Sequence, residues 1–372
     1  MAMTGTTKPD RGQRRPETAS QPRPASLRIT PDDVTYLVAT AARAPSVHNS
    51  QPWQFRVRGS AVELYADRGR MLRRVDPGGR EMLISCGAAL YGLRLGMRRL
   101  GYLPDVELLP DPAQPRLIAR VRPVGRAVTS PGEWDLIAAV PHRHTHRGPF
   151  AAGQVPARLM DALVRDAAVE GADLHLVSQL AEVRELAELT EAAGRGQLAH
   201  PGIRAELREW TRPAGSAARD GVPAHAWADP SWVAEPDPAA GPGPPAGRQR
   251  PPEEPAHERL PQRDFGRPGG LPSGGPLPSA TAVLTTAGDS PADWLAAGQA
   301  LDRLLLRAAT RWVFASLQSQ PLESARFRAE VRDRLHLDGM PQMLLQFGRA
   351  GTAPATARRP AAELIDRARP EP

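Results

Sequence analysis

The chain has 372 residues, which is enough for two domains or for one large domain with extensions. Its formal net charge of +7 comes almost wholly from arginine, since Lys8 is the only lysine, and aromatic residues make up only 5%. The arginines stand singly or in pairs among acids, without the basic, ring-bearing stripe of a nucleic-acid surface. We therefore expect no nucleic-acid partner.

The single cysteine and the terminal sequence limit the chemistry and the compartment. Cys86 excludes an internal disulfide, and its place in an apolar helical run predicts a buried side chain. Residues 1–27 are polar and proline-rich, lack the apolar core of a signal peptide, and are expected to be disordered. No stretch approaches the ~20 apolar residues of a membrane span. We expect a cytoplasmic protein with no membrane partner.

The first third of the chain predicts a helix, two strands and a second helix. Thr30, Pro31 and the acids that follow have the residue types of a helix start, and this helix should end near Arg43. Residues 53–67 predict two strands joined by a two-residue turn that begins with Gly59. Apolar residues at steps of three and four predict a long helix over 80–100. A strand over 116–121 and a short helix over 133–139 follow.

The rest of the chain partly repeats this pattern. We expect helices over 156–168, 179–193 and 291–317, and strands over 173–177, over 281–286 and in "PQMLLQFG". The long helices 80–100 and 291–317 occupy similar places in two successive halves, so an internal duplication is predicted. Residues 233–279 are rich in proline and glycine and are predicted to form a flexible insertion or lid. The fold class is α+β.

The stretch "APSVHNSQPW" gathers short polar side chains between Pro45 and Pro52. A loop fixed by two prolines could present these groups to the edge of a flat heteroaromatic ligand. Alternatively, its asparagine and serines satisfy backbone groups at a helix end. The residues alone favour neither interpretation.

The stretch "PHRHTHRGPF" places Arg143 and Arg147 four residues apart, with Thr145 between them. Two permanent cations and a hydroxyl suit a phosphate dianion, although a solvated basic turn has the same composition. The alternating histidines 142, 144 and 146 could meet at a metal ion, but the nearby arginines would repel it, so we expect no metal. Arg358 and Arg359, before Pro360, could complete an anion site or merely cap the C-terminal segment.

Several familiar motifs are missing from the sequence. It contains no G-x-x-x-x-G-K-[ST] phosphate loop, no G-x-S-x-G nucleophile elbow, and no G-x-G-x-x-G after a strand. An ATPase, an esterase and a Rossmann dehydrogenase are disfavoured.

Five stretches taken together resemble the FMN-dependent nitroreductase superfamily. They are "AARAPSVHNSQPWQF", the run from Glu63 to Gly101, "RHTHRGPF", "LQSQPLE" and "PQMLLQFG". The resemblance is closest to its Acg-type branch, in which one chain carries two nitroreductase-like halves and mimics the usual homodimer. It implies a first half over 28–140 and a second over 141–365, with 233–279 as a lid. It also implies one complete flavin site per chain and a functional monomer.

The resemblance also implies which residues hold the FMN. The loop of the first half and the arginine pair of the second would contact one flavin, and "SQP" would approach its ring. The candidates are Pro45, Ser46, His48, Asn49, Gln51, Arg143, Thr145, Arg147, Ser319, Gln320, Pro321, Arg358 and Arg359. Because flavin N5 carries the hydride, no catalytic side chain is expected.

Three functions follow as hypotheses. The first is an FMN-dependent oxidoreductase that passes a hydride from NAD(P)H to a small organic acceptor. The second is a protein that sequesters FMN behind a lid with little or no turnover. The third is a basic interaction protein without a cofactor.

Overall fold

The computed structural model describes residues 27–147, 150–213, 215–223, 260, 261, 263, 280–350 and 356–366. The predicted tail over 1–27 lies outside these ranges apart from residue 27. The predicted insertion over 233–279 also lies outside them, apart from residues 260, 261 and 263.

The first half of the chain builds a four-stranded antiparallel sheet in the order β1-β2-β4-β3. Two helices, α1 and α2, pack against it around a core that includes Trp53, Phe55 and Leu93. Helix α1 begins where expected because the Thr30 side chain accepts the amide of Asp33, whose carboxylate accepts the amide of Thr30. The elements are α1 (Pro31–Ala41), β1 (Trp53–Arg58), β2 (Ala61–Ala66), α2 (Arg80–Arg99), β3 (Tyr102–Leu108), β4 (Leu117–Arg126) and α3 (Pro131–Ala139).

The second half builds another four-stranded antiparallel sheet, in the order β5-β8-β10-β9. Helices α4 and α8 pack on it around a second core. Its elements are α4 (Ala157–Val169), β5 (Asp173–Val177), β8 (Ala280–Thr286), α8 (Pro291–Ala309), β9 (Val313–Gln318), α9 (Ala325–Arg334) and β10 (Met340–Arg349).

Both sheets follow one order of elements: helix, strand, strand, helix, strand, strand. The main difference lies in the link between the first two strands. In the first half this link is the turn at Gly59 and Ser60, whereas in the second it runs from 178 to 279. This long link contains α5 (Leu180–Ala199), α6 (Pro201–Glu209), β6 (Thr211–Arg212) and β7 (Val222–Pro223).

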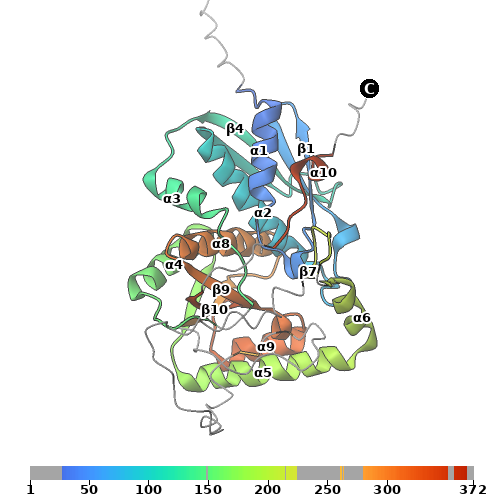
Figure 1. Cartoon of the computed structure of the whole chain (residues 1–372), viewed down its shortest axis with the longest axis vertical. Coiled ribbons are helices and arrows are strands. Elements are labelled where there is room, and N and C mark those ends of the chain that lie inside the picture. Colours follow the sequence, from blue (N-terminus) through green and yellow to red (C-terminus); the bar gives the residue numbers. More distant parts are fainter. Residues whose placement is uncertain are drawn as a thin grey trace, which may run out of the picture.

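Helices α2 and α8 are in backbone contact and lie between the two sheets (Figure 1). A Cβ atom placed on Gly298 would lie 2.0 Å from the Ile84 carbonyl oxygen, and one on Gly87 would lie 2.3 Å from that of Leu295. Only glycine permits this approach. The crossing brings the two halves of the chain together at the site described below.

The C-terminal segment, residues 356–366, returns to the first sheet (Figure 1). Ile365 forms a parallel bridge with Phe55, and the amide of Asp366 donates to the Phe55 carbonyl at 2.8 Å. Helix α10 (Ala361–Leu364) adds Ala361 and Leu364 to the first core. The end of the predicted second half therefore covers the first sheet.

The structure corrects one long element. The helix predicted over 291–317 is wrong beyond Ala309, where α8 ends. Trp312 then adopts the left-handed φ of 53°, and β9 begins at Val313. The apolar run "VFASLQ" is buried on both sides of the strand, so it lacks the alternation that would have distinguished it from a buried helix.

Other elements agree with expectation or were not predicted. The start of α1, both strands of the first hairpin, and α2, β8 and β10 are confirmed, and Cys86 is fully buried as predicted. Strand β3, helix α6 and helix α9 were not predicted. Within the described ranges, no helix has both the length and the apolar character that crossing a membrane requires.

Candidate functional site

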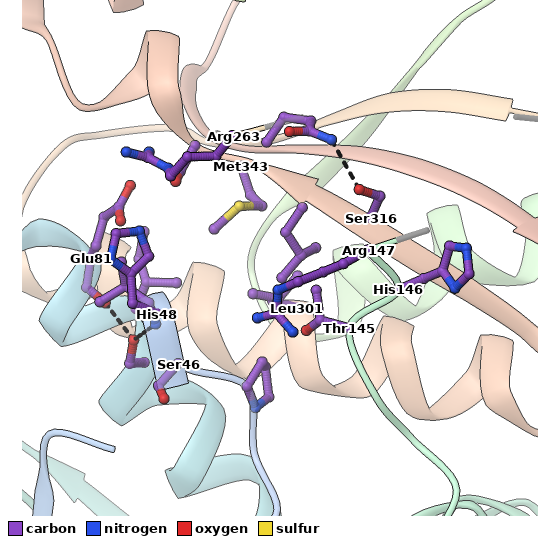
Figure 2. Close-up of a pocket in the computed structure, with 17 residues that line it drawn as sticks. Ser46, His48, Glu81, Thr145, His146, Arg147, Arg263, Leu301, Ser316 and Met343 are labelled. Atoms are coloured by element: carbon purple, nitrogen blue, oxygen red, sulfur yellow. Dashed lines mark hydrogen bonds between the residues drawn. The ribbon is translucent and has the colours of Figure 1, made fainter. Parts of the chain in front are cut away.

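A cavity of about 90 Å³ lies where the two halves meet. One wall comes from the loop after α1 and from the start of α2, and the other from the segment after α3, from α8 and from strands β9 and β10 (Figure 2). The lining residues used below are Ser46, His48, Glu81, Thr145, Arg147, Arg263 and Ser319.

Six of the thirteen candidate residues line this cavity: Pro45, Ser46, His48, Thr145, Arg147 and Ser319. The loop near residue 48 and the segment near residue 145 therefore face the same space, although about a hundred positions separate them. The other seven do not line it: Asn49, Gln51, Arg143, Gln320, Pro321, Arg358 and Arg359. Gln320 and Pro321 are buried in the short helix η4 (Gln320–Leu322).

The loop after α1 has an unusual backbone. His48, Asn49 and Gln51 have φ values of 47°, 56° and 50°, in the left-handed region that non-glycine residues seldom adopt. Side-chain hydrogen bonds to distant backbone hold this conformation. Gln51 Nε2 donates to the Arg219 carbonyl at 2.8 Å, and Gln51 Oε1 accepts the Arg359 amide at 2.8 Å.

Asn49 has a similar structural role. Its Nδ2 donates to the carbonyls of Gly221 and Ala357, both at 3.1 Å. Ser46 serves both purposes, since its Oγ accepts the Gln51 amide at 3.0 Å while the residue lines the cavity. The two interpretations of the loop, a ligand-facing surface and a set of backbone partners, thus apply to different residues. The side chains of Asn49 and Gln51 form hydrogen bonds with backbone groups, whereas Ser46 and His48 line the cavity.

Next to the cavity lies an arginine cluster, which we define as Arg43, Arg143, Arg147 and Arg358. Arg143 is 3% exposed, and its Nη2 donates to the Arg43 carbonyl at 2.8 Å. Arg358 Nη2 donates to the Ala44 carbonyl at 3.3 Å. Among the described residues, Asp302 is the acid that offsets this charge, with its Oδ1 3.9 Å from Arg143 Nε.

Burial and the neighbouring charges shift the pKa values of the arginine cluster and of Asp302. Burial, and then the repulsion of the neighbouring Arg143, lowers the pKa of Arg147 to about 10. Burial raises the pKa of Asp302 to about 7, against the opposing effect of Arg143 and Arg358. Arg143 is buried and the other three arginines are half-buried, and the acid beside them has a raised pKa, so positive charge is in excess around Asp302.

Arg147 is the member of the cluster that reaches the cavity. Its side chain extends into the middle of the space, whereas His146 points away from it (Figure 2). Within the described ranges, no carboxylate or carbonyl forms a hydrogen bond or ion pair with its guanidinium, and Arg143 Nη1 also lacks a partner there. Arg143 is buried and Arg147 is half-buried, and guanidiniums that are only partly paired in such surroundings fit a phosphate group, which supplies charge and acceptor oxygens.

The three alternating histidines do not converge. Their rings stack on separate aromatic rings: His142 on Trp312, His144 on Phe314 and His146 on Phe150, with centroids 5.5, 4.1 and 4.6 Å apart. Burial lowers the pKa of His144 to about 4. Across the described ranges, no group of three or more histidine, cysteine or acidic side chains could hold a metal ion.

The opposite side of the cavity contains two charged residues that the sequence did not reveal. Arg263, from the predicted insertion, forms an ion pair with Glu323, and its Nη2 also donates to Ser319 Oγ at 3.4 Å. Leu260, nearby in the chain, is buried in a third core with Val177 and Leu186. At least these residues of the predicted flexible insertion are anchored.

Glu81 is the second of these residues. It lies in the first turn of α2, where an acid is ordinarily interpreted as a complement to the helix dipole. The available signal was the pair Arg80–Glu81 at the start of an otherwise apolar helix. For Arg263, one arginine within a proline-rich run, the sequence carries no comparable signal.

Comparison with known proteins places the chain in a family. It is 30% identical over 347 residues to "Putative NAD(P)H nitroreductase Rv3131" of Mycobacterium tuberculosis, covering 90% of this chain and 91% of that protein. "Putative NAD(P)H nitroreductase acg" of the same organism is 37% identical over 123 residues, or 33% of this chain and 37% of that protein. The chain belongs to the nitroreductase superfamily and is Acg-like.

Two further comparisons complete this result. No family model matches the sequence. A nitroreductase with bound FMN from Bacteroides fragilis matches with a TM-score of 0.34 and 12% identity, over 60% of this chain and 92% of that one. The assignment rests on the sequence relatives.

Proposed function

We propose that the chain is an FMN-dependent oxidoreductase of nitroreductase type that uses NAD(P)H to reduce a small organic acceptor. The observation that carries this proposal is the shared cavity: the loop at Ser46 and His48 and the segment at Thr145 and Arg147 line one space. Its family relatives bear NAD(P)H nitroreductase names, and the nitroreductase from Bacteroides fragilis binds FMN.

The residues around the cavity suit this cofactor. Arg147 would contact the phosphate from the cavity wall, and Arg143 and Arg358, which do not line the cavity, would add their charge nearby, because the excess positive charge has no counterion among the described residues beyond Asp302. Ser46, His48, Thr145 and Ser319 would position the ring system. FMN, when bound, supplies hydride transfer through its N5 atom. The protein orients the reactants and limits the access of water.

The common order of elements in the two sheets supports an internal pseudo-dimer. In this proposal residues 28–140 and 141–365 are two nitroreductase-like halves, related as the subunits of a dimer and in contact through α2 and α8. The cavity takes its loop from the first half and its arginine pair from the second. One chain would then form one flavin site and act as a monomer.

The visible spectrum of the purified protein tests the proposal. We expect flavin absorption, and bleaching when NADPH is added without air. The double variant R143A/R147A should bind FMN at least ~10-fold more weakly for each guanidinium removed. Unchanged FMN affinity in this variant would show that the phosphate lies elsewhere, and a colourless protein that takes up no FMN would contradict the proposal.

One contact favours the second hypothesis, in which the protein stores FMN. Arg263 lies on the cavity and is anchored to Glu323 and Gln197 by side-chain contacts. A flavin covered in this way would be released slowly and would not be bleached by NADPH. R263A should then release FMN faster than wild type, and bleaching at an ordinary rate in wild type would rule out storage without turnover.

A further inference from the structure

A second charged cluster borders the cavity, opposite the arginine cluster. This acid cluster consists of Asp76, Glu81, Glu323, Arg80 and Arg263, whose side chains are all buried. Ion pairs join Arg80 to Glu81 and Arg263 to Glu323. Three carboxyls thus face two guanidiniums. Because an unbalanced buried charge is costly, we expect the cluster to keep one proton at neutral pH.

Hydrogen bonds indicate which carboxyl holds that proton. Glu323 accepts from Arg263, from Gln197 Nε2 at 2.6 Å and from Ser319 Oγ at 2.7 Å. Asp76 accepts the Met82 amide at 2.9 Å. Both carboxylates are stabilised by donors that the surrounding fold holds in place.

Glu81 has weaker support for its ionised form. Its hydrogen bond from Arg80 Nη2 is 3.1 Å long, and the same nitrogen also donates to the Leu322 carbonyl at 3.2 Å. Burial, followed by repulsion from Glu323, raises the pKa of Glu81 well above its ordinary value. The charged groups around it are Arg80, Asp76, Glu323 and Arg263, and His48 lies on the same wall of the cavity with a pKa that burial lowers well below its ordinary value.

Among the three carboxyls, Glu81 is the one that lines the cavity, on the wall that carries Ser46 and His48 (Figure 2). We propose that Glu81 is a catalytic acid that donates a proton to an organic acceptor bound in this cavity. This inference rests on the proposed function and adds a protein acid to a site for which the sequence predicted none.

Reduction of the acceptor requires a proton, which Glu81 would supply. A quinone that receives a hydride from the reduced nicotinamide gains two electrons and one proton, and it needs a second proton to leave as a neutral hydroquinone. The O–H bond of Glu81 would break as a new O–H bond forms on the quinone oxygen. The resulting carboxylate lies beside Arg80 and regains its proton from water. Positioned acids of this kind contribute about 10²–10⁴-fold to a rate.

Carbon-13 NMR of the full chain, labelled at the glutamate side-chain carboxyl, tests the protonation directly. We expect one glutamate signal to keep the shift of a protonated acid at pH 7, and to be absent from E81Q. In D76N, two carboxyls would face two guanidiniums, so the Glu81 signal should move to that of a carboxylate. An ionised Glu81 in wild type at pH 7 would overturn the inference.

Rapid-mixing measurements on the flavin-loaded protein test the role. E81Q should be reduced by NADPH as fast as wild type, whereas reoxidation by 1,4-benzoquinone should slow about 10²-fold and lose its solvent isotope effect. E170Q, which alters a buried glutamate outside the cavity, serves as the control and should leave both rates unchanged. Equal reoxidation rates in E81Q and wild type would remove Glu81 from the reaction.

The two proposals fail in different ways. A chain that takes up no flavin would overturn the proposed function and the proton-donor role together. A flavin-loaded chain with an ionised Glu81, or with an E81Q variant that is reoxidised normally, would overturn only the role of Glu81.

Discussion

The guanidinium of Arg143 lies 3.9 Å from the carboxylate of Asp302, and both side chains are almost completely buried. This contact is too long for a direct hydrogen bond, and Asp302 Oδ1 has no other hydrogen-bond partner among the described residues. Asp302 therefore lies beside the arginine cluster without a direct hydrogen bond from Arg143. The consequences for stability and for ligand binding can be separated by substitution.

Replacement of Asp302 by asparagine should change how stability depends on pH. Burial raises the pKa of Asp302 from 3.8 to about 7, so between these values the folded chain holds a proton that the unfolded chain has lost. Its contribution to stability is complete below the unfolded value and declines as pH rises through about 7. At about 1.36 kcal/mol per pKa unit, the decline is of the order of a few kcal/mol.

Urea denaturation from about pH 4 to about pH 8 measures this effect. Other buried acids also titrate in this range, since burial raises the pKa of Asp76 to about 6. The informative quantity is therefore the difference in unfolding free energy between D302N and wild type. It should shift in favour of D302N as pH rises, and parallel curves would contradict the assignment.

Arg147 should affect folding and ligand binding in opposite directions. Its guanidinium is half-buried and has no ion-pair partner among the described residues, and burial lowers its pKa to about 10, so R147M should raise the unfolding free energy of the FMN-free chain by about 1 kcal/mol. The same variant should bind FMN at least ~10-fold more weakly. Thermal melts with and without FMN measure both effects. R195M, at a largely exposed arginine in α5, is the control and should change neither the unfolding free energy nor FMN binding. If R147M were less stable than wild type, the charge of Arg147 would already be compensated in the FMN-free chain.

Much of the scaffold could be predicted because local signals agreed with tertiary packing. Helix α1 has its capping box, and α2 has apolar residues at helical spacing. Strand β3 was missed because Pro104 and the acids around it are unusual in a strand. The proline is tolerated because β3 is an edge strand of its sheet.

The residues of the candidate site also fall into those that the sequence identified and those that it did not. The loop at Ser46 and the arginine pair were identified from short motifs, and the structure places part of each on the cavity. Glu81 and Arg263 were missed because their importance depends on which distant groups they meet. The pattern of one helix, or of one proline-rich run, does not contain that information.

Gln51 should stabilise the C-terminal segment on the first sheet. Its side chain is fully buried and joins the Arg219 carbonyl to the Arg359 amide. Q51A leaves both groups without this partner and should cost about 1–3 kcal/mol. Hydrogen exchange should quicken over residues 356–366. Q114A, which removes an exposed side-chain hydrogen bond to Asp111, is the matched control and should leave exchange there unchanged. Unaltered protection in Q51A would mean that helix α10 holds the segment without the loop.

The crossing of α2 and α8 should tolerate no side chain at Gly298. A methyl group there would lie 2.0 Å from the Ile84 carbonyl oxygen and 2.8 Å from the Gly87 Cα, and both are backbone atoms that cannot rotate away. G298A must therefore separate the two helices, at a cost at or above the 1–3 kcal/mol usual for overpacking.

G194A in α5 provides the contrast, because nothing lies within 4 Å of its added methyl group. It should stabilise the chain by about 0.5–1 kcal/mol through helix propensity. Urea unfolding of the two variants measures the difference, and a G298A chain as stable as wild type would show that the helices are not in backbone contact. Because the cavity lies between residues of these two helices, G298A should also weaken FMN binding even though Gly298 does not line it.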